Sequence, residues 1–208
     1  MKIILIRHGE TYSNTLFGTD EQILIGALDN ELTKLNDEGK KQAEKARDIL
    51  GSLIEEVDEI YSSDLVRTRQ TTEIVFEGRA YKVDQRIRER SLGILEGMKV
   101  NEVKKQLELN NCLPDDSEME TFFLRKHESG ENYVDVYNRC KDFMKQFNYD
   151  SDKTICIVSH FHTIRCLLYV LMNKSFDEEF NSLLIKNATP YILEYKNGKF
   201  ECETESFR

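Results

Sequence analysis

Two short stretches of the chain are apolar at nearly every position. They are 2–6 (Lys-Ile-Ile-Leu-Ile) and 154–158 (Thr-Ile-Cys-Ile-Val), and both are rich in β-branched residues. Apolar runs of this length, bounded by polar residues, are typical of strands buried on both faces of a parallel sheet. Weaker runs predict further strands at 57–61, 80–83, 191–196 and 199–203. The last two flank Asn197-Gly198, a dipeptide that favours a tight hairpin turn.

Between these runs, apolar residues recur at helical spacing. After Asn36, which is suited to cap a helix, the apolar positions are Ala43, Ala46, Ile49, Leu50 and Leu53. Patterns of this kind predict helices at 40–53, 65–76, 101–109, 132–147, 163–172 and 177–184. Asp64 is expected to cap the second of them. Strands that alternate with helices indicate an α/β protein, here a three-layer α/β/α sandwich with a mostly parallel sheet and an antiparallel end.

Two stretches depart from this alternation. Residues 11–35 are polar and irregular, and they predict a loop that packs over the edge of the sheet. Residues 86–130 have a charge-dense start, two interrupting glycines and a polar loop at 114–118. We interpret 86–130 as a cap-like insertion over the C-terminal edge of the sheet, within a single domain that spans 1–208.

Composition limits the classes of function. Of the 208 residues, 39% are hydrophobic and 32% charged, as in a globular protein, and no apolar run approaches the ~20 residues that span a bilayer. The net charge of −9 argues against a nucleic-acid surface, which needs a basic stripe. The first residues lack the apolar segment of a signal peptide, so we expect a cytoplasmic protein without a membrane partner. The oligomeric state stays open, with a homodimer through the last strand as one alternative.

The cysteines do not follow a disulfide or metal-binding pattern. They are odd in number, and none belongs to a Cys-x-x-Cys pair: Cys112, Cys140, Cys156, Cys166 and Cys202. A disulfide framework or a zinc site would need closer, paired spacing, so we expect free thiols and no metal.

Cationic and imidazole side chains follow the strands predicted to be most deeply buried. Arg7 and His8 come directly after the first strand, His160 follows 154–158, and Arg67 lies near the start of a helix that follows another strand. The carboxyl ends of parallel strands meet at one edge of a sheet, where α/β proteins bind their ligands. Guanidinium groups repel a metal cation but suit a phosphoryl group, whose phosphorus a neutral imidazole can attack. From these residues alone, the alternative is a set of strand ends whose charges only reach solvent.

Longer motifs surround these residues. Along the chain they are Leu5-Ile6-Arg7-His8-Gly9-Glu10-Thr11, Tyr61-Ser62-Ser63-Asp64-Leu65-Val66-Arg67-Thr68-Arg69-Gln70-Thr71, Ile87-Arg88-Glu89, Ser129-Gly130-Glu131 and Val158-Ser159-His160. In this order, and over nearly the whole chain, they resemble the motifs of the histidine phosphatase (phosphoglycerate mutase-like) superfamily, which opens with an Arg-His-Gly (RHG) motif. The chain is most similar to the phosphatase branch of that superfamily.

The resemblance implies a role for each of the five central residues. His8 would be the nucleophile that becomes phosphohistidine, and Arg7, Arg67 and His160 would complete the phosphate pocket. Glu89 would be the general acid and base, which protonates the leaving oxygen and then activates water. Arginine neighbours should lower the pKa of Glu89, whereas burial and bound phosphate should raise it, so the direction of its shift stays open.

Three more residues lie in the sequence near these motifs: Asn14, Phe161 and His162. Asn14 matches a position that contacts phosphate or substrate in the superfamily. Phe161 stands where the superfamily usually has glycine, so we expect its ring to line and narrow the phosphate-binding pocket. His162 is expected to cap a helix or to face solvent rather than to contact the substrate.

The resemblance implies an enzyme, a phosphoric monoester hydrolase of the histidine acid phosphatase type. Its substrate would be a small phosphorylated metabolite, and the arginines would make a cofactor unnecessary. The alternative is a 2,3-bisphosphoglycerate-dependent phosphoglycerate mutase, which returns the phosphate to the substrate instead of to water. We favour hydrolysis because the segment after Glu89 lacks the Arg-Arg-Ser, proline-rich block of the mutases, and the chain has only two prolines. A non-catalytic phosphate-binding module is the least favoured function, since both His8 and Glu89 are present.

Overall fold

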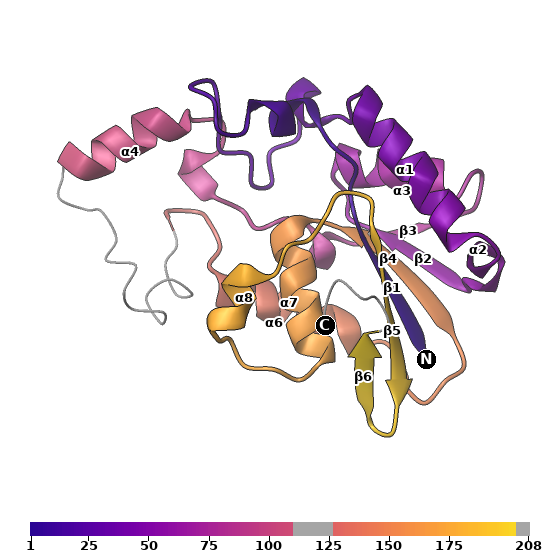
Figure 1. The fold of residues 1–208 in the computed structure, drawn as a ribbon. Coiled ribbons are helices and arrows are strands. Elements are labelled where there is room, and N and C mark those ends of the chain that lie inside the picture. Colours follow the sequence, from indigo (N-terminus) through magenta and orange to yellow (C-terminus); the bar gives the residue numbers. More distant parts are fainter. Residues whose placement is uncertain (110–126, 203–208) are drawn as a thin grey trace.

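The fold is built on a six-stranded sheet. The computed structural model describes residues 1–109 and 127–202, without the side chains at 104 and 106–109. The strands are β1 (Lys2–Arg7), β2 (Glu59–Ser62), β3 (Lys82–Val83), β4 (Thr154–Ser159), β5 (Pro190–Lys196) and β6 (Lys199–Cys202). They lie in the order β3-β2-β4-β1-β5-β6 (Figure 1). The first four strands in that order are parallel, whereas β5 and β6 form the predicted antiparallel end.

Helices cover both faces of this sheet, which confirms the predicted α/β sandwich (Figure 1). One face packs against α1 (Asp37–Leu50) and α3 (Val66–Val75), and the other against α6 (Tyr133–Met144) and α7 (Phe161–Leu171). The remaining helices are α2 (Leu53–Glu56), α4 (Val100–Leu109) and α8 (Glu178–Ser182). Single 3-10 turns are η1 (Tyr12–Leu16), η2 (Glu31–Thr33), η3 (Gln85–Ile87) and η4 (Gly93–Leu95).

The central strands are buried on both faces, as their uninterrupted apolar sequences predict. In β1, Ile3 and Leu5 pack with α6 and α7, whereas Ile4 and Ile6 pack with α1. All four side chains are fully buried, and each contributes roughly 1.5–3 kcal/mol relative to an exposed position. The same alternation recurs in β4, through Ile155, Cys156, Ile157 and Val158. The two central strands therefore anchor the edge of the sheet at which they end.

The first predicted helix begins at its predicted cap but ends early. The side chain of Asn36 accepts the N–H of Gly39, which starts α1 at Asp37. Gly51 takes a positive φ of +50°, which glycine adopts readily, and it ends α1 and separates α2 from it. The glycine inside the predicted segment 40–53 therefore divides it.

Asp64 does not cap α3, so that prediction is wrong. Its carboxylate pairs with Arg88, with distances of 3.0 and 2.5 Å. The N–H of Val66, at the start of α3, donates instead to Asp29 at 3.1 Å. Asp29, which is distant in sequence, thus accepts the first N–H of α3 in place of Asp64, whose carboxylate pairs with Arg88.

The region predicted as a cap is described only in part. Residues 110–126, which include Cys112 and the predicted polar loop 114–118, lie outside the described residues. The part before them lies at the end of the sheet where β1 and β4 terminate, beside the loop that precedes α1 (Figure 1). The N–H of Leu24 donates to Met98 at 2.9 Å and the N–H of Gly97 to Leu24 at 2.7 Å, so the two segments are joined. The role of 86–130 as a cap stays a prediction.

Two further findings concern the described ranges alone. Cys140, Cys156, Cys166 and Cys202 are free thiols. Within 1–109 and 127–202, no helix combines the length and the apolar character needed to cross a membrane.

Candidate active site at the carboxyl ends of three strands

The adjacent parallel strands β1, β4 and β2 end within one residue of one another at the same edge of the sheet. Arg7, the last residue of β1, lies opposite Ser159 of β4. The residues that directly follow the three strands are His8, His160 and Ser63. The ring centroids of His8 and His160 are 5.3 Å apart. The structure therefore brings the two strand-end histidines together, as the parallel strands led us to expect.

His8 is held in one tautomer. Its Nδ1 lies 2.8 Å from the carbonyl oxygen of Gly9. A carbonyl oxygen can only accept, so Nδ1 carries the ring proton and Nε2 keeps its lone pair. The neighbouring backbone is fixed as well, because the N–H of Gly9 donates to Thr71 at 3.0 Å and the side-chain amide of Asn187 donates to the carbonyl of His8 at 2.9 Å. The unprotonated Nε2 is a suitable nucleophile.

His160 is fully buried where β4 leads into α7. Its Nε2 lies 2.9 Å from the hydroxyl oxygen of Ser63. Within the described residues, its Nδ1 has no hydrogen-bond partner. A buried polar atom without a partner costs about 1–3 kcal/mol. A phosphate oxygen bound at Nδ1 would remove that cost.

Hydrogen bonds to backbone carbonyl oxygens hold the guanidinium groups of Arg7 and Arg67 in place. Arg67 is buried near the start of α3 and donates to Gly26 at 2.9 Å and to Leu28 at 3.0 Å. Arg7 donates to Ile185 at 2.8 Å, and its buried Nε has no partner in the part of the chain that the structure describes. A neutral carbonyl orients a guanidinium group without cancelling its charge. Both guanidinium groups thus stay charged and can bind an anion.

Burial and these two cations keep both histidines neutral. Burial lowers the pKa of His8 far below its ordinary value, and the charges of Arg67 and Arg7 lower it further. The pKa of His160 is lowered well below the ordinary value by burial first and then by Arg67. Burial lowers the pKa of Arg67 to about 10, so that this group stays charged at neutral pH. Two neutral imidazoles beside two cations can bind a phosphate group and attack it.

Glu89 lies beside the start of α7 and is only 8% exposed. Its Oε1 accepts the N–H of Arg90 at 2.8 Å, and its Oε2 accepts the N–H of His162 at 3.3 Å. Burial raises the pKa of Glu89, but His162, the N–H of Arg90 and the charge of Arg67 together outweigh burial, so the pKa lies below its ordinary value. The direction that the sequence left open is therefore downward, and the carboxylate is ionised at neutral pH.

The prediction that His162 caps a helix or faces solvent is wrong. Its Nδ1 lies 2.8 Å from the hydroxyl oxygen of Tyr133, and its ring packs edge-on against Phe161 with centroids 5.1 Å apart. The reason is that α7 begins at Phe161, earlier than predicted, so position 162 lies in the first helical turn next to Glu89. Burial lowers the pKa of His162 to about 4, and the ring is neutral at neutral pH.

The two other residues predicted to lie at the phosphate site, Phe161 and Asn14, contact side chains and backbone of the protein itself. The ring of Phe161 contacts two guanidinium groups, with its centroid 5.1 Å from Cζ of Arg7 and 4.2 Å from Cζ of Arg165. It therefore supports Arg7 through a cation–π contact. The side-chain oxygen of Asn14 accepts the N–H and the hydroxyl of Thr11, both at 3.0 Å. The amide nitrogen of Asn14 carries two more protons that can be donated to a ligand.

The sequence analysis missed three residues that orient the two histidines. Ser63 and Thr71 lie inside quoted motifs, but their spacing gave no sign of which imidazole or backbone group they would contact. Asn187 is 179 residues from His8, and no local pattern marks it. Among residues 1–109 and 127–202, no group of three His, Cys, Asp or Glu side chains is placed to hold a metal ion.

Comparison with known proteins shows the family to which the chain belongs. The sequence model of the histidine phosphatase superfamily (branch 1) matches residues 3–206. Broad-specificity phosphatase YOR283W of Saccharomyces cerevisiae is 28% identical over 201 residues, which cover 94% of this chain and 80% of that protein. Phosphoserine phosphatase 1 of Hydrogenobacter thermophilus is 32% identical over 177 residues, which cover 83% of this chain and 76% of that protein.

Solved structures show the same fold. A mycobacterial glucosyl-3-phosphoglycerate phosphatase has a TM-score of 0.77 at 23% identity, over 98% of this chain and 97% of that one. A putative alpha-ribazole-5'-P phosphatase from Escherichia coli has a TM-score of 0.79 at 20% identity, over 98% of this chain and 95% of that one. Because the superfamily's sequence model spans nearly the whole chain, this protein belongs to branch 1 of the histidine phosphatase superfamily.

Proposed function

We propose that this protein is a phosphomonoesterase of the histidine acid phosphatase type, which hydrolyses a small phosphorylated metabolite through phosphohistidine on His8. One observation carries the proposal. The bond between Nδ1 of His8 and the carbonyl of Gly9 leaves Nε2 unprotonated, beside Arg7 and Arg67, whose charges depress the pKa of the ring. A neutral, oriented imidazole next to two cations is what attack on a phosphate ester requires.

In the first step, Nε2 of His8 attacks the phosphorus, and an N–P bond forms as the bond to the leaving oxygen breaks. Arg7, Arg67 and Nδ1 of His160 hold the other phosphate oxygens while their charge redistributes. The carboxyl of Glu89 gives its proton to the leaving oxygen. Since Glu89 is ionised in the free protein, it gains that proton with the substrate, whose negative charge raises its pKa.

In the second step, water attacks the phosphorus, and the N–P bond to His8 breaks. The carboxylate of Glu89 takes a proton from that water as general base. Inorganic phosphate leaves, and Nε2 of His8 regains its lone pair. The two steps together consume one water and leave the protein unchanged.

The names of the relatives support hydrolysis, with one alternative. Relatives matched over most of this chain are called phosphatases, including a phosphoserine phosphatase. Others are called probable phosphoglycerate mutases, such as one from Escherichia fergusonii, 32% identical over 110 residues that cover 52% of this chain. In a mutase, phosphohistidine would return its phosphate to the substrate. The fate of the phosphate on His8 therefore separates the two functions.

The proposal can be tested by trapping the intermediate. The protein is mixed with 4-nitrophenyl phosphate and quenched, and the peptide that contains His8 is analysed by mass spectrometry while released phosphate is measured. We expect an acid-labile phosphate on His8 together with steady phosphate release. Both should vanish in His8→Ala and persist in His127→Ala, which changes a histidine outside the site.

Two results would contradict the proposal. A long-lived phosphohistidine with little phosphate release would indicate the mutase. If the folded wild-type protein shows neither phosphate on His8 nor turnover, the result would indicate a phosphate-binding module.

A further inference from the structure

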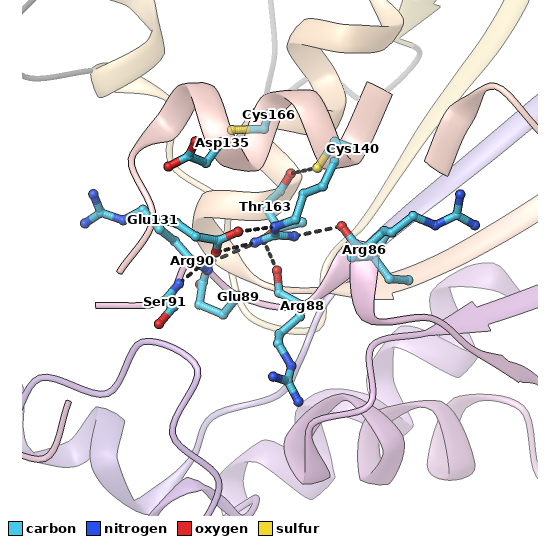
Figure 2. A network of polar contacts seen from close by, with 12 residues as sticks. Arg86, Arg88, Glu89, Arg90, Ser91, Glu131, Asp135, Cys140, Thr163 and Cys166 are labelled. Carbon is cyan, nitrogen blue, oxygen red and sulfur yellow. Dashed lines mark hydrogen bonds and ion pairs between the residues drawn. The ribbon is translucent and has the colours of Figure 1, made fainter. Parts of the chain in front are cut away.

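The segment that carries Glu89 depends on side chains from elsewhere for its shape. Residues 88–91 belong to no helix or strand. Figure 2 shows the polar contacts that surround them. Glu131 accepts the N–H of Ser91 at its Oε2 (3.0 Å), and Thr163 of α7 donates its hydroxyl to the carbonyl of Arg88 (2.6 Å). The backbone on both sides of Glu89 is thus held by residues more than 30 positions away.

Arg139 completes this set of contacts from α6. Its Nη1 donates to the carbonyl oxygen of Arg86 at 2.7 Å. Its Nε and Nη2 donate to the two carboxylate oxygens of Glu131, at 2.8 and 3.1 Å. Arg139 and Glu131 therefore form one hydrogen-bonded unit that contacts the backbone before Glu89, at Arg86, and after it, at Ser91.

The pair is poorly placed to act mainly as a source of stability. The side chains of Arg139 and Glu131 are only 17% and 26% exposed, so both charges have lost most of their water. A buried ion pair of this kind recovers little more than its desolvation cost. What the two-pronged geometry does provide is a fixed position for the groups it contacts.

We propose that the Arg139–Glu131 pair is a positioning element that holds Glu89 in place to protonate the leaving oxygen. The inference rests on the proposed function, because it needs Glu89 as general acid. Arg139 acts through the carbonyl of Arg86, and Glu131 acts through the N–H of Ser91. Misplacement of a catalytic group by about 1 Å can cost about 100-fold in rate.

The test compares two substrates that differ in their need for a proton. 4-Nitrophenyl phosphate releases a stable anion, whereas phenyl phosphate, nearly the same in shape, releases a more basic one. The value of kcat/KM covers the steps up to transfer of phosphate to His8, in which Glu89 acts as acid. In Arg139→Lys, which keeps the charge but loses the two-pronged contact, we expect kcat/KM to fall about 10- to 100-fold for phenyl phosphate. The fall for 4-nitrophenyl phosphate should be much smaller.

Two more variants separate positioning from general loosening. Glu131→Gln keeps an oxygen for the N–H of Ser91 and should shift the substrate ratio in the same direction, but less. Asp142→Asn is the matched control, because Asp142 also lies on α6 and pairs with Arg86, yet through the side chain at 3.1 Å rather than the backbone. It should leave the ratio as in the wild type. The affinity for inorganic phosphate should be unchanged in all three variants.

Each outcome bears on one of the two proposals. A wild-type protein that hydrolyses both esters, with Arg139→Lys and Glu131→Gln lowering both equally or not at all, overturns the positioning role alone. An equal shift of the ratio in Asp142→Asn overturns it as well. A folded wild-type protein that hydrolyses neither ester overturns the proposed function and the inference with it.

Discussion

The hydroxyl oxygen of Ser63 lies 2.9 Å from Nε2 of His160 and 3.3 Å from the backbone nitrogen of Leu65. Since the N–H of Leu65 can only donate, it occupies an acceptor site of the hydroxyl, and the hydroxyl proton is free to go to His160. In this arrangement Nε2 of His160 accepts, and Nδ1 carries the proton. The donor of His160 is then the buried atom that lacks a partner among the described residues, ready for a phosphate oxygen.

We therefore predict that Ser63→Ala weakens the phosphate pocket without removing any group that touches phosphate. The loss of one neutral hydrogen bond corresponds to about 0.5–1.5 kcal/mol, or up to about tenfold in kcat/KM. Nitrogen NMR of the wild type should show His160 protonated at Nδ1, and Ser63→Ala should show a mixture of tautomers. A wild-type His160 protonated at Nε2 would contradict the assignment.

The ionised state of Glu89 predicts how the rate responds to pH. Its pKa lies below the ordinary value in the free protein, so the acid form that the first step needs becomes more abundant as pH falls. The ratio of kcat/KM between the wild type and Glu89→Gln, measured on phenyl phosphate, should rise from pH 8 to pH 5. Ionisation of the substrate is common to both proteins and cancels. A ratio that stays constant, or that rises with pH, would be incompatible with Glu89 as general acid.

A chelator should not inhibit the enzyme. Arg7 and Arg67 place positive charge where other phosphoryl-transfer enzymes use a metal ion. Initial rates after dialysis against EDTA should match those of untreated protein, and added Mg²⁺ should not raise them. A large loss that Mg²⁺ restores would mean that the arginines do not carry the charge stabilisation.

The framework of the fold followed from local sequence patterns, since the runs at 2–6 and 154–158 fix the two central strands. The parallel arrangement then brought His8 and His160 to one edge without further information. Errors arose where a distant partner decided the local structure. The sequence predicts that Asp64 caps a helix, but its carboxylate pairs instead with Arg88, which is 24 residues away.

The protonation states of the site residues could not be predicted from the sequence for the same reason. The state of Glu89 results from burial, one backbone N–H from its neighbour and another from His162, 73 residues later. Opposing effects of comparable size cannot be summed without coordinates. The tautomer of His160 likewise depends on Ser63, which lies on a different strand end.

The contact between His162 and Tyr133 predicts a supporting role for the imidazole ring. In His162→Ala the backbone N–H that bonds Glu89 remains, whereas the ring, its 2.8 Å contact with Tyr133 and its edge-on packing against Phe161 are lost. We expect kcat/KM to fall by no more than about tenfold, the value of one neutral hydrogen bond, with phosphate still transferred to His8. His160→Ala should cost more, because it removes a donor to the phosphate itself. Equal losses in the two variants would contradict this ranking.

The backbone after His8 presses on the start of α1 so closely that no side chain fits between them. A Cβ atom at Gly39 would lie 2.0 Å from the carbonyl oxygen of Glu10, and one at Gly9 would lie 2.3 Å from that of Gly39. Both obstacles are backbone atoms, which cannot rotate away as a flexible side chain would. Gly39→Ala must therefore displace either α1 or the Gly9-Glu10 segment next to the nucleophile.

We predict that Gly39→Ala lowers both stability and activity. Overpacking of this kind costs about 1–3 kcal/mol in the free energy of unfolding, which corresponds to a fall of roughly 2–12 °C in Tm for a protein of this size. Activity should fall even below the unfolding transition, since the carbonyl of Gly9 fixes the tautomer of His8. Thermal unfolding and kcat/KM should be compared with Lys41→Ala, an exposed position of the same helix. If Gly39→Ala were as stable and as active as Lys41→Ala, the close approach of the two backbones would not be a constraint on the site.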